Sequence, residues 1–164
     1  MSQKILIVTN HYLPGFKAGG PIKSVSSLCE NLKSIFNITI MTSSHDFGEV
    51  EPYKNIEFDK LINFNDCNII YLSNINAYSI FKKITLLNVD IIYLNSFFSV
   101  RFSLIPLILA KFYKKPIVLG PRGELSDGAL SLKAFKKRVY IQLYKLLNFA
   151  HGIVFQASSN FEFD

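Results

Sequence analysis

The sequence predicts an α/β fold in which helices cover both faces of a doubly wound, mainly parallel β-sheet, within one domain covering residues 1–164. Six short runs rich in Ile, Val, Leu and Tyr recur along the chain, and several are apolar at consecutive positions. Such runs are typical of strands that are buried on both faces, as in a parallel sheet. Segments with helical periodicity separate the runs, and this alternation favours a Rossmann-like sheet. At roughly 150 residues per domain, the length fits a single domain.

The first expected strand covers residues 5–9, and a helix over 22–35 follows it. The apolar side chains of this helix are three or four residues apart and should form one buried stripe. They are Ile22, Val25, Leu28, Leu32 and Ile35. A second strand at 38–42 precedes a polar stretch, 43–65, which we expect to be a surface excursion with a short strand at 56–58.

The second half of the chain continues the alternation. The remaining predicted strands cover residues 69–72, 89–94, 117–119 and 153–155, with helices expected over 76–88, 99–114 and 131–147. Apolar residues recur at helical spacing in the last of these helices, so we expect them to form its buried face. They are Leu132, Phe135, Val139, Leu143 and Leu146.

Composition excludes several classes of protein. Hydrophobic residues make up 49% of the chain and charged residues 18%, which excludes intrinsic disorder. Cys29 and Cys67 lack the spacing of metal ligands, which excludes a zinc module and a disulfide scaffold, and no metal or cofactor is expected. The apolar stretch 97–113 is interrupted by charges and proline, which indicates a buried helix and not a membrane span. Without a signal peptide, the protein is expected to be cytoplasmic.

The formal charge of +6 favours anionic partners. The basic residues form no recognisable nucleic-acid motif, so no nucleic acid is expected as a partner. The expected helix over 131–147 carries a cluster of cations: Lys133, Lys136, Lys137, Arg138 and Lys145. A basic amphipathic helix of this kind either lies on an anionic membrane surface, as in a peripheral protein on the inner face of the plasma membrane, or presents an ordinary solvated face.

Ligands of open α/β sheets bind at the carboxyl ends of the strands, so the loops that follow the strands hold the candidate site residues. The loop after the first strand contains His11 and ends in Gly19 and Gly20, directly before Pro21. Glycines let backbone N–H groups approach a phosphate or sugar closely, and a helix N-terminus favours negative charge. The alternative is that the glycines only make a tight turn before the helix.

Two further loops carry polar side chains. Asn95 and Ser96 follow the strand at 89–94, where they either contact a hydroxylated ligand or cap the next helix. Arg122 lies between Pro121 and Gly123 after the strand at 117–119. Its guanidinium is suited to phosphate or carboxylate, and the alternative is a structural pairing with Glu124 or a helix C-terminus.

Three segments resemble a known family when they are taken together. They are ILIVTNHYLPGFKAGGPIKSVSSLCENL, VDIIYLNSFFSVRFSLIPLILAKFYKKPIVLGPRGELSDGAL and GIVFQASS. In order and spacing they resemble the N-terminal half of a glycosyltransferase family 4 enzyme of the GT-B fold. The PRG-x-L-S segment is similar to a subgroup linked to the synthesis of capsule, O-antigen and exopolysaccharide.

This resemblance implies a retaining transfer of a sugar from a nucleotide-sugar donor to a glycan or lipid-linked acceptor. It implies that Gly19 and Gly20 approach the donor diphosphate and that Arg122 and its neighbours Gly123 and Glu124 face the acceptor. Asn95 matches a position that is His in several members, and 156–160 reads QASSN where the subgroup often has HATSE.

The donor-binding C-terminal domain of that family has no counterpart in the 164 residues, so we expect the chain alone to be inactive. One alternative is a non-catalytic Rossmann-like module that binds an anionic sugar or nucleotide. A basic nucleic-acid-binding α/β domain is a more distant third.

Overall fold

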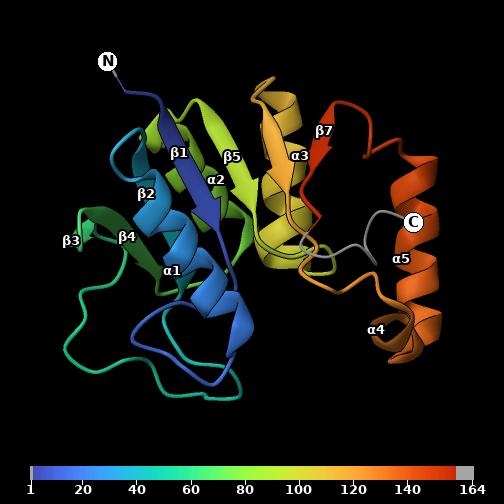
Figure 1. The fold of residues 1–164 in the computed structure, drawn as a ribbon, viewed down its shortest axis with the longest axis horizontal. Coiled ribbons are helices and arrows are strands. Elements are labelled where there is room, and N and C mark those ends of the chain that lie inside the picture. Colours follow the sequence, from blue (N-terminus) through green and yellow to red (C-terminus); the bar gives the residue numbers. More distant parts are fainter. Residues whose placement is uncertain (1, 158–164) are drawn as a thin grey trace.

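The computed structural model describes residues 2–157 and contains one seven-stranded sheet with the order β3-β4-β2-β1-β5-β6-β7 (Figure 1). All neighbouring strands are parallel except β3, which is antiparallel to β4. The strands are β1 (Lys4–Val8), β2 (Asn37–Ser43), β3 (Ile62–Phe64), β4 (Cys67–Leu72), β5 (Ile91–Leu94), β6 (Ile117–Leu119) and β7 (Ile153–Phe155). The predicted α/β class with a mainly parallel, Rossmann-like sheet is confirmed.

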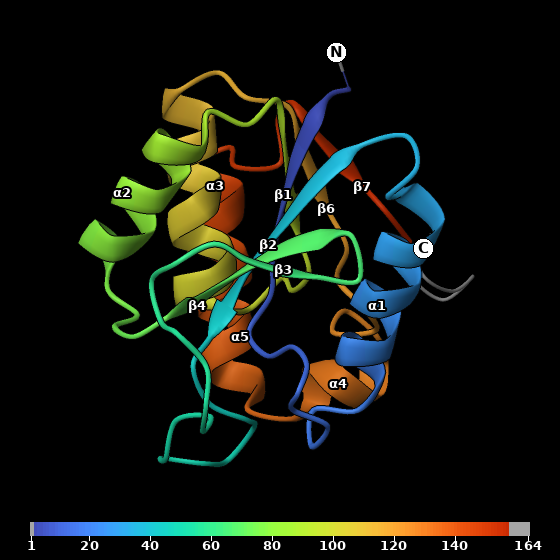
Figure 2. The ribbon, with the colours of Figure 1, turned by 90° about the vertical axis from the view of Figure 1, so that its left-hand side faces the viewer.

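Helices cover both faces of the sheet (Figure 2). They are α1 (Gly20–Leu32), α2 (Ala77–Leu87), α3 (Ile105–Phe112), α4 (Asp127–Ser131) and α5 (Ala134–Leu146), and a π-helical turn, η1 (Val100–Leu104), leads into α3. Helix α1 packs on one face, where Val25 meets strand residues such as Ile7. Helices α2, α3 and α5 pack on the other face, around Leu6 and Val8. The alternation of strand side chains between the two cores explains why the strands are apolar at consecutive positions.

The six predicted strands are all present, but the short strand expected at 56–58 is wrong. Ile56 and Phe58 are half-buried against the core beneath α1 and have no strand partner. The additional strand is instead β3, which adds to the edge of the sheet beside β4. A short apolar pair in a polar stretch indicates packing against a core, which does not require backbone pairing.

The last helix differs most from its prediction. The expected single helix is interrupted at Leu132 and Lys133, where Lys133 has a φ of 56°. Residues 131–147 therefore contain the end of α4 and the whole of α5. The apolar stripe expected to be buried is exposed: Phe135 is 81% exposed and Leu146 80%. Tyr144, with the half-buried Tyr140, lies on the packed face instead. Helix α5 has two apolar faces, and periodicity alone does not tell which of them packs on the sheet.

Candidate functional site

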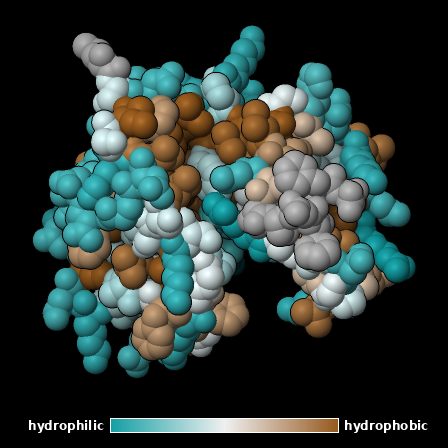
Figure 3. Space-filling model, viewed as in Figure 1, coloured by the Kyte–Doolittle hydropathy of each residue, from teal (hydrophilic) through white to brown (hydrophobic). Residues whose placement is uncertain are grey.

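The candidate site lies where the sheet changes its direction of winding. Strand β1 is in the centre of the sheet, with β2 on one side and β5 on the other. The loops that follow β1 and β5 therefore separate, and a crevice opens at the carboxyl ends of these two strands. The space-filling view shows a hollow between the part that contains α1 and the part that contains α4 and α5 (Figure 3).

A cavity of about 260 Å³ occupies this crevice. It is lined by Thr9, Asn10, His11, Lys17, Ala18, Pro21, Phe47, Asn95, Ser96, Arg122 and Glu124. The structure thus brings together five residues that the sequence analysis singled out: His11, Asn95, Ser96, Arg122 and Glu124. The other three, the glycines at 19, 20 and 123, lie next to lining residues but do not line the cavity themselves.

Asn95 and Arg122 form a hydrogen-bonded pair on the wall of the cavity. Arg122 Nε donates to Asn95 Oδ1 at 2.9 Å, and Asn95 Nδ2 lies 3.4 Å from Thr9 Oγ1. Arg122 Nη2 also donates to the hydroxyl of Tyr93, and the guanidinium lies over the Tyr93 ring, 5.7 Å from its centre. Tyr93 in turn donates to Gln156 Oε1 at 2.7 Å, so the network joins the loops after β5, β6 and β7.

Glu124 lies beside this network, and both of its oxygens are occupied. Oε1 accepts from Ser96 Oγ at 2.9 Å, while Oε2 accepts from the backbone N–H groups of Phe97 at 2.5 Å and Phe98 at 3.1 Å. No ion pair between Arg122 and Glu124 occurs among the described residues, so the structure does not support the alternative in which they pair. Glu124 holds the loop after β5 in place, and a role in ligand binding stays a prediction.

The loop after β5 also settles the question of the helix cap. Ser99 caps η1, because its Oγ accepts from the backbone N–H of Phe102 at 3.1 Å. Ser99 Oγ also donates to Asn10 Oδ1 at 2.7 Å. Asn95 and Ser96 therefore do not serve as caps, and both line the cavity.

His11 reaches the cavity with its ring orientation fixed by the protein. Its Nδ1 lies 3.1 Å from the backbone oxygen of His45 and 3.2 Å from Ser43 Oγ. Because a carbonyl oxygen only accepts, this contact assigns the proton to Nδ1. In this tautomer of the neutral ring, Nε2 is the nitrogen that can accept a hydrogen bond.

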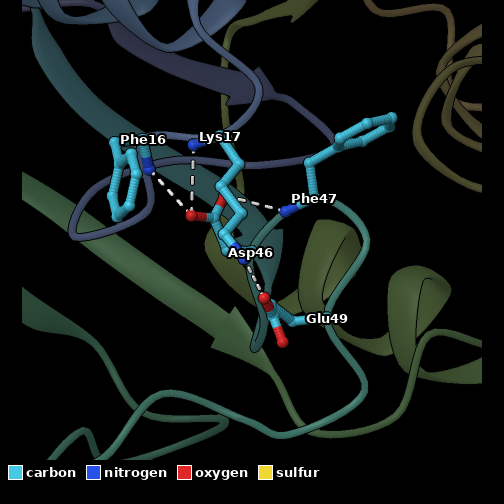
Figure 4. Close-up of polar contacts among 5 residues, drawn as sticks. All are labelled: Phe16, Lys17, Asp46, Phe47 and Glu49. Atoms are coloured by element: carbon cyan, nitrogen blue, oxygen red, sulfur yellow. Dashed lines mark hydrogen bonds and ion pairs between the residues drawn. The ribbon is translucent and has the colours of Figure 1, made fainter.

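Asp46 fastens the glycine-rich loop to the rest of the site (Figure 4). Its Oδ2 accepts from the backbone N–H groups of Phe16 at 2.9 Å and Lys17 at 3.2 Å, and its Oδ1 accepts from Phe47 N–H at 2.7 Å. Lys17 and Glu49 add an ion pair between the same two loops. Burial by itself would raise the pKa of Asp46, but the three N–H groups stabilise the carboxylate, so the pKa lies below its usual value.

We expect the Asp46 carboxylate to make the free energy of unfolding depend on pH. A carboxyl group with a lowered pKa in the folded state stabilises the fold above its unfolded pKa, which is about 4. The contribution is lost as the pH falls through the lower, folded pKa. Asp46→Asn should therefore unfold more easily than wild type at pH 7, and the difference should shrink as the pH falls below about 4. Urea unfolding between pH 7 and pH 3 measures this, and a constant difference would contradict it.

The glycines at 15, 19 and 20 in the first loop differ in whether the structure requires glycine at their position. Gly15 is buried, and a Cβ there would lie 2.7 Å from Asp46 Oδ1 and overlap the Tyr53 hydroxyl, so only glycine fits. Gly19 precedes α1 with a φ of 64°, a conformation that favours glycine. Gly20 has neither constraint, because no atom lies within 4 Å of a Cβ built on it. The turn thus explains Gly19 and leaves Gly20 unexplained.

Two more cavities continue the crevice beside β2 and β4. One of about 340 Å³ includes His11, His45 and Arg101 in its lining, and one of about 520 Å³ includes His45 and Arg101. Within residues 2–157, no Asp or Glu lines either of them. His45 and Arg101 were missed as site residues in the sequence, since no motif marks them.

Tyr93 and Asp46 were missed as well. Tyr93 reads as a core residue of β5, and nothing in the sequence distinguishes it from its apolar neighbours. Asp46 had a usable signal, because it comes shortly after β2 (Asn37–Ser43), at the carboxyl edge of the sheet where Asn95 was selected. Within residues 2–157, no group of three or more His, Cys, Asp or Glu side chains is arranged to hold a metal ion.

No protein-family model matches the chain, and no curated protein matches it. The subgroup motif at 156–160 lies partly outside the described residues, and of its described part, Gln156 accepts the hydrogen bond from Tyr93.

Proposed function

We propose that the crevice binds a sugar linked to phosphate, and that the chain is the acceptor-side half of a retaining glycosyltransferase that uses a nucleotide-sugar donor. The acceptor would be a glycan or a lipid-linked sugar of a surface polysaccharide. The observation that carries the proposal is the convergence of Arg122, Asn95 and His11 on one cavity at the switch point of the sheet. The resemblance of the three segments supplies the reaction type.

The cavity has the chemistry that a phosphorylated sugar requires. Hydroxyl and amide groups of Thr9, Asn10 and Ser96 offer both donors and acceptors to sugar hydroxyls. The guanidinium of Arg122 and the N-terminus of α1, where Pro21 lines the cavity, favour a negatively charged phosphate. Because groups that bind hydroxyls and groups that bind anions lie in one crevice, a sugar phosphate fits it better than an uncharged sugar or a phosphate alone.

His11 is the residue best placed to accept a proton from an acceptor hydroxyl. With Nδ1 donating to the His45 carbonyl, the lone pair of Nε2 is available. Among the described residues that line the cavity, the only carboxylate is that of Glu124, and it already accepts three hydrogen bonds. We propose that His11 binds or deprotonates the hydroxyl, and that groups stabilising the departing nucleotide come from a donor-binding domain.

The second candidate function is a binding module without catalysis. It is favoured by one observation: Glu124 already accepts three hydrogen bonds, which leaves no carboxylate among the described lining residues free to act as a base. Both candidates require the cavity to bind an anionic sugar or nucleotide. They differ in transfer activity: the enzyme transfers sugar when a donor-binding domain follows this chain, and the module does not.

Replacing Gly20 by alanine tests the binding step. A Cβ on Gly20 meets no protein atom, so the fold should accept the methyl group, and alanine favours a helix by about 0.5–1 kcal/mol. If Gly20 instead allows a phosphate to approach the start of α1, the methyl group occupies that space. We expect affinity for nucleoside diphosphate sugars to fall about tenfold, or about 1.4 kcal/mol, with an unchanged or higher melting temperature.

Calorimetric titration with uridine and guanosine diphosphate sugars, and with a soluble sugar diphosphate, measures this effect. Gly128→Ala is a matched control, since Gly128 lies in α4 and a Cβ there also meets nothing within 4 Å. Equal affinity of the Gly20→Ala and Gly128→Ala variants would contradict the role of Gly20. Failure of the wild type to bind any of the probes would contradict the proposed function itself.

A further inference from the structure

Helix α5 exposes a continuous apolar face. Five large side chains, which we name the apolar stripe, lie on the helix or just before it and point away from the sheet. The stripe consists of Leu132, Phe135, Val139, Leu143 and Leu146, all of which are exposed. Isolated apolar residues on a surface are ordinary, but a contiguous row on one helix marks an interaction site.

The opposite face of α5 is firmly packed, which fixes the stripe in its outward position. The Tyr140 hydroxyl donates to the backbone oxygen of Phe97 at 2.9 Å. The Tyr144 ring lies 4.9 Å from that of Phe97 and 5.6 Å from that of Phe149. Because α5 is anchored by these tyrosines, it cannot rotate to bury the stripe without losing the aromatic cluster.

Cations border the stripe on both sides. At 100° per residue, Lys136 follows one edge of the stripe, while Arg138 and Lys145 follow the other. All three are exposed, and none forms an ion pair within the described part of the chain. The sequence contains no Asp or Glu from 128 to 157, and the nearest acidic residue before that stretch, Asp127, lines a cavity together with Arg138. Lys137 differs, because it donates to the Ala129 carbonyl and lies over the Phe98 ring.

We propose that α5 docks on the surface of an anionic lipid bilayer, with the apolar stripe at the boundary between headgroups and acyl chains. Lys136, Arg138 and Lys145 would then reach the lipid phosphates. Charge complementarity selects this partner, since cations on both sides of an apolar row match a plane of anionic headgroups. The proposal goes beyond the proposed function and stands independently of it.

The helix is suited to lie on the bilayer and not to cross it. Its 13 residues span about 20 Å, whereas the hydrocarbon core is about 30 Å thick. Among residues 2–157, no helix is long and apolar enough to cross a membrane. The basic residues that border the stripe are those that an interfacial helix keeps in contact with headgroups.

Vesicle flotation of the 164-residue chain tests the proposal. We expect binding to vesicles of phosphatidylcholine with phosphatidylglycerol, weak binding to phosphatidylcholine alone, and a decrease in binding as salt is raised. The triple variant Phe135→Gln, Leu143→Gln, Leu146→Gln removes apolar area, and Lys136→Gln, Arg138→Gln, Lys145→Gln removes charge. Each should lower the partition coefficient about a hundredfold.

The matched control is Tyr78→Gln with Leu86→Gln on α2, where both side chains are exposed to a similar degree. This control should float as the wild type does. All variants should keep the wild-type melting temperature, because the replaced side chains are exposed. Flotation of the stripe variant at the wild-type level would overturn the proposal. So would a wild type that ignores anionic vesicles but forms a dimer that the stripe variant abolishes, since the stripe would then contact a second copy.

Discussion

Replacing Glu124 by alanine should destabilise the fold by about 3 kcal/mol, because a hydrogen bond to a charged group contributes about 1.5–3 kcal/mol. The carboxylate accepts from Ser96 Oγ and from the backbone N–H groups of Phe97 and Phe98. Alanine removes all three interactions and leaves the donors of the β5 loop without partners in a partly buried place. A loss of this size is a large part of the stability of a typical domain, which is about 5–15 kcal/mol.

Urea unfolding measures the change, with Glu57→Ala as the matched control. Glu57 pairs with Lys60 at 2.8 Å on the surface, where water screens the interaction, so its removal should leave the free energy of unfolding close to the wild-type value. Glu124→Gln should lie between wild type and alanine, because an amide keeps one accepting oxygen and turns a donor toward the N–H groups. A Glu124→Ala variant as stable as Glu57→Ala would show that Glu124 does not hold the loop.

Most of the fold could be predicted from the sequence because two independent patterns indicate the strands of a parallel sheet. Their residues are apolar at consecutive positions, as in β1, and helical segments separate them. The two wrong predictions, the strand at 56–58 and the buried face of the last helix, have the same cause: their apolar residues are compatible with more than one arrangement. Ile56 and Phe58 are as compatible with loop packing as with a strand, and Phe135 is as compatible with an exposed stripe as with a core.

The residues of the candidate site could be predicted only where they directly follow a predicted strand. Asn95 and Arg122 follow buried strands directly, so the rule that ligands bind at carboxyl ends was enough to select them. Tyr93 and Gln156 belong to the same network, but Tyr93 lies inside β5 and Gln156 directly follows β7. Their roles depend on which strands are neighbours, and strand order is a long-range property that local patterns do not contain.

Arg122 should have the largest effect on ligand binding of any residue in the cavity. Its guanidinium uses Nε for Asn95 and Nη2 for Tyr93, while Nη1 has no hydrogen-bond partner among residues 2–157. Asn95 and Tyr93 thus orient the forked guanidinium through Nε and Nη2, and Nη1 remains as a donor for a ligand in the cavity. An arginine held in this way is pre-organised for a phosphate, and a charge-assisted hydrogen bond contributes about 1.5–3 kcal/mol.

We therefore expect Arg122→Ala to lower the affinity for nucleoside diphosphate sugars by about tenfold to a hundredfold. Arg122→Lys should restore little of this affinity, because a single ammonium cannot contact Asn95, Tyr93 and a ligand in one plane. Lys114→Ala is the matched control, since Lys114 is an exposed cation with a φ of 52°, close to the 56° of Arg122. It should bind as the wild type does, so that backbone strain and lost charge are both controlled. If Arg122→Lys binds like the wild type, the cavity requires only a positive charge, and the geometry of the fork has no part in recognition.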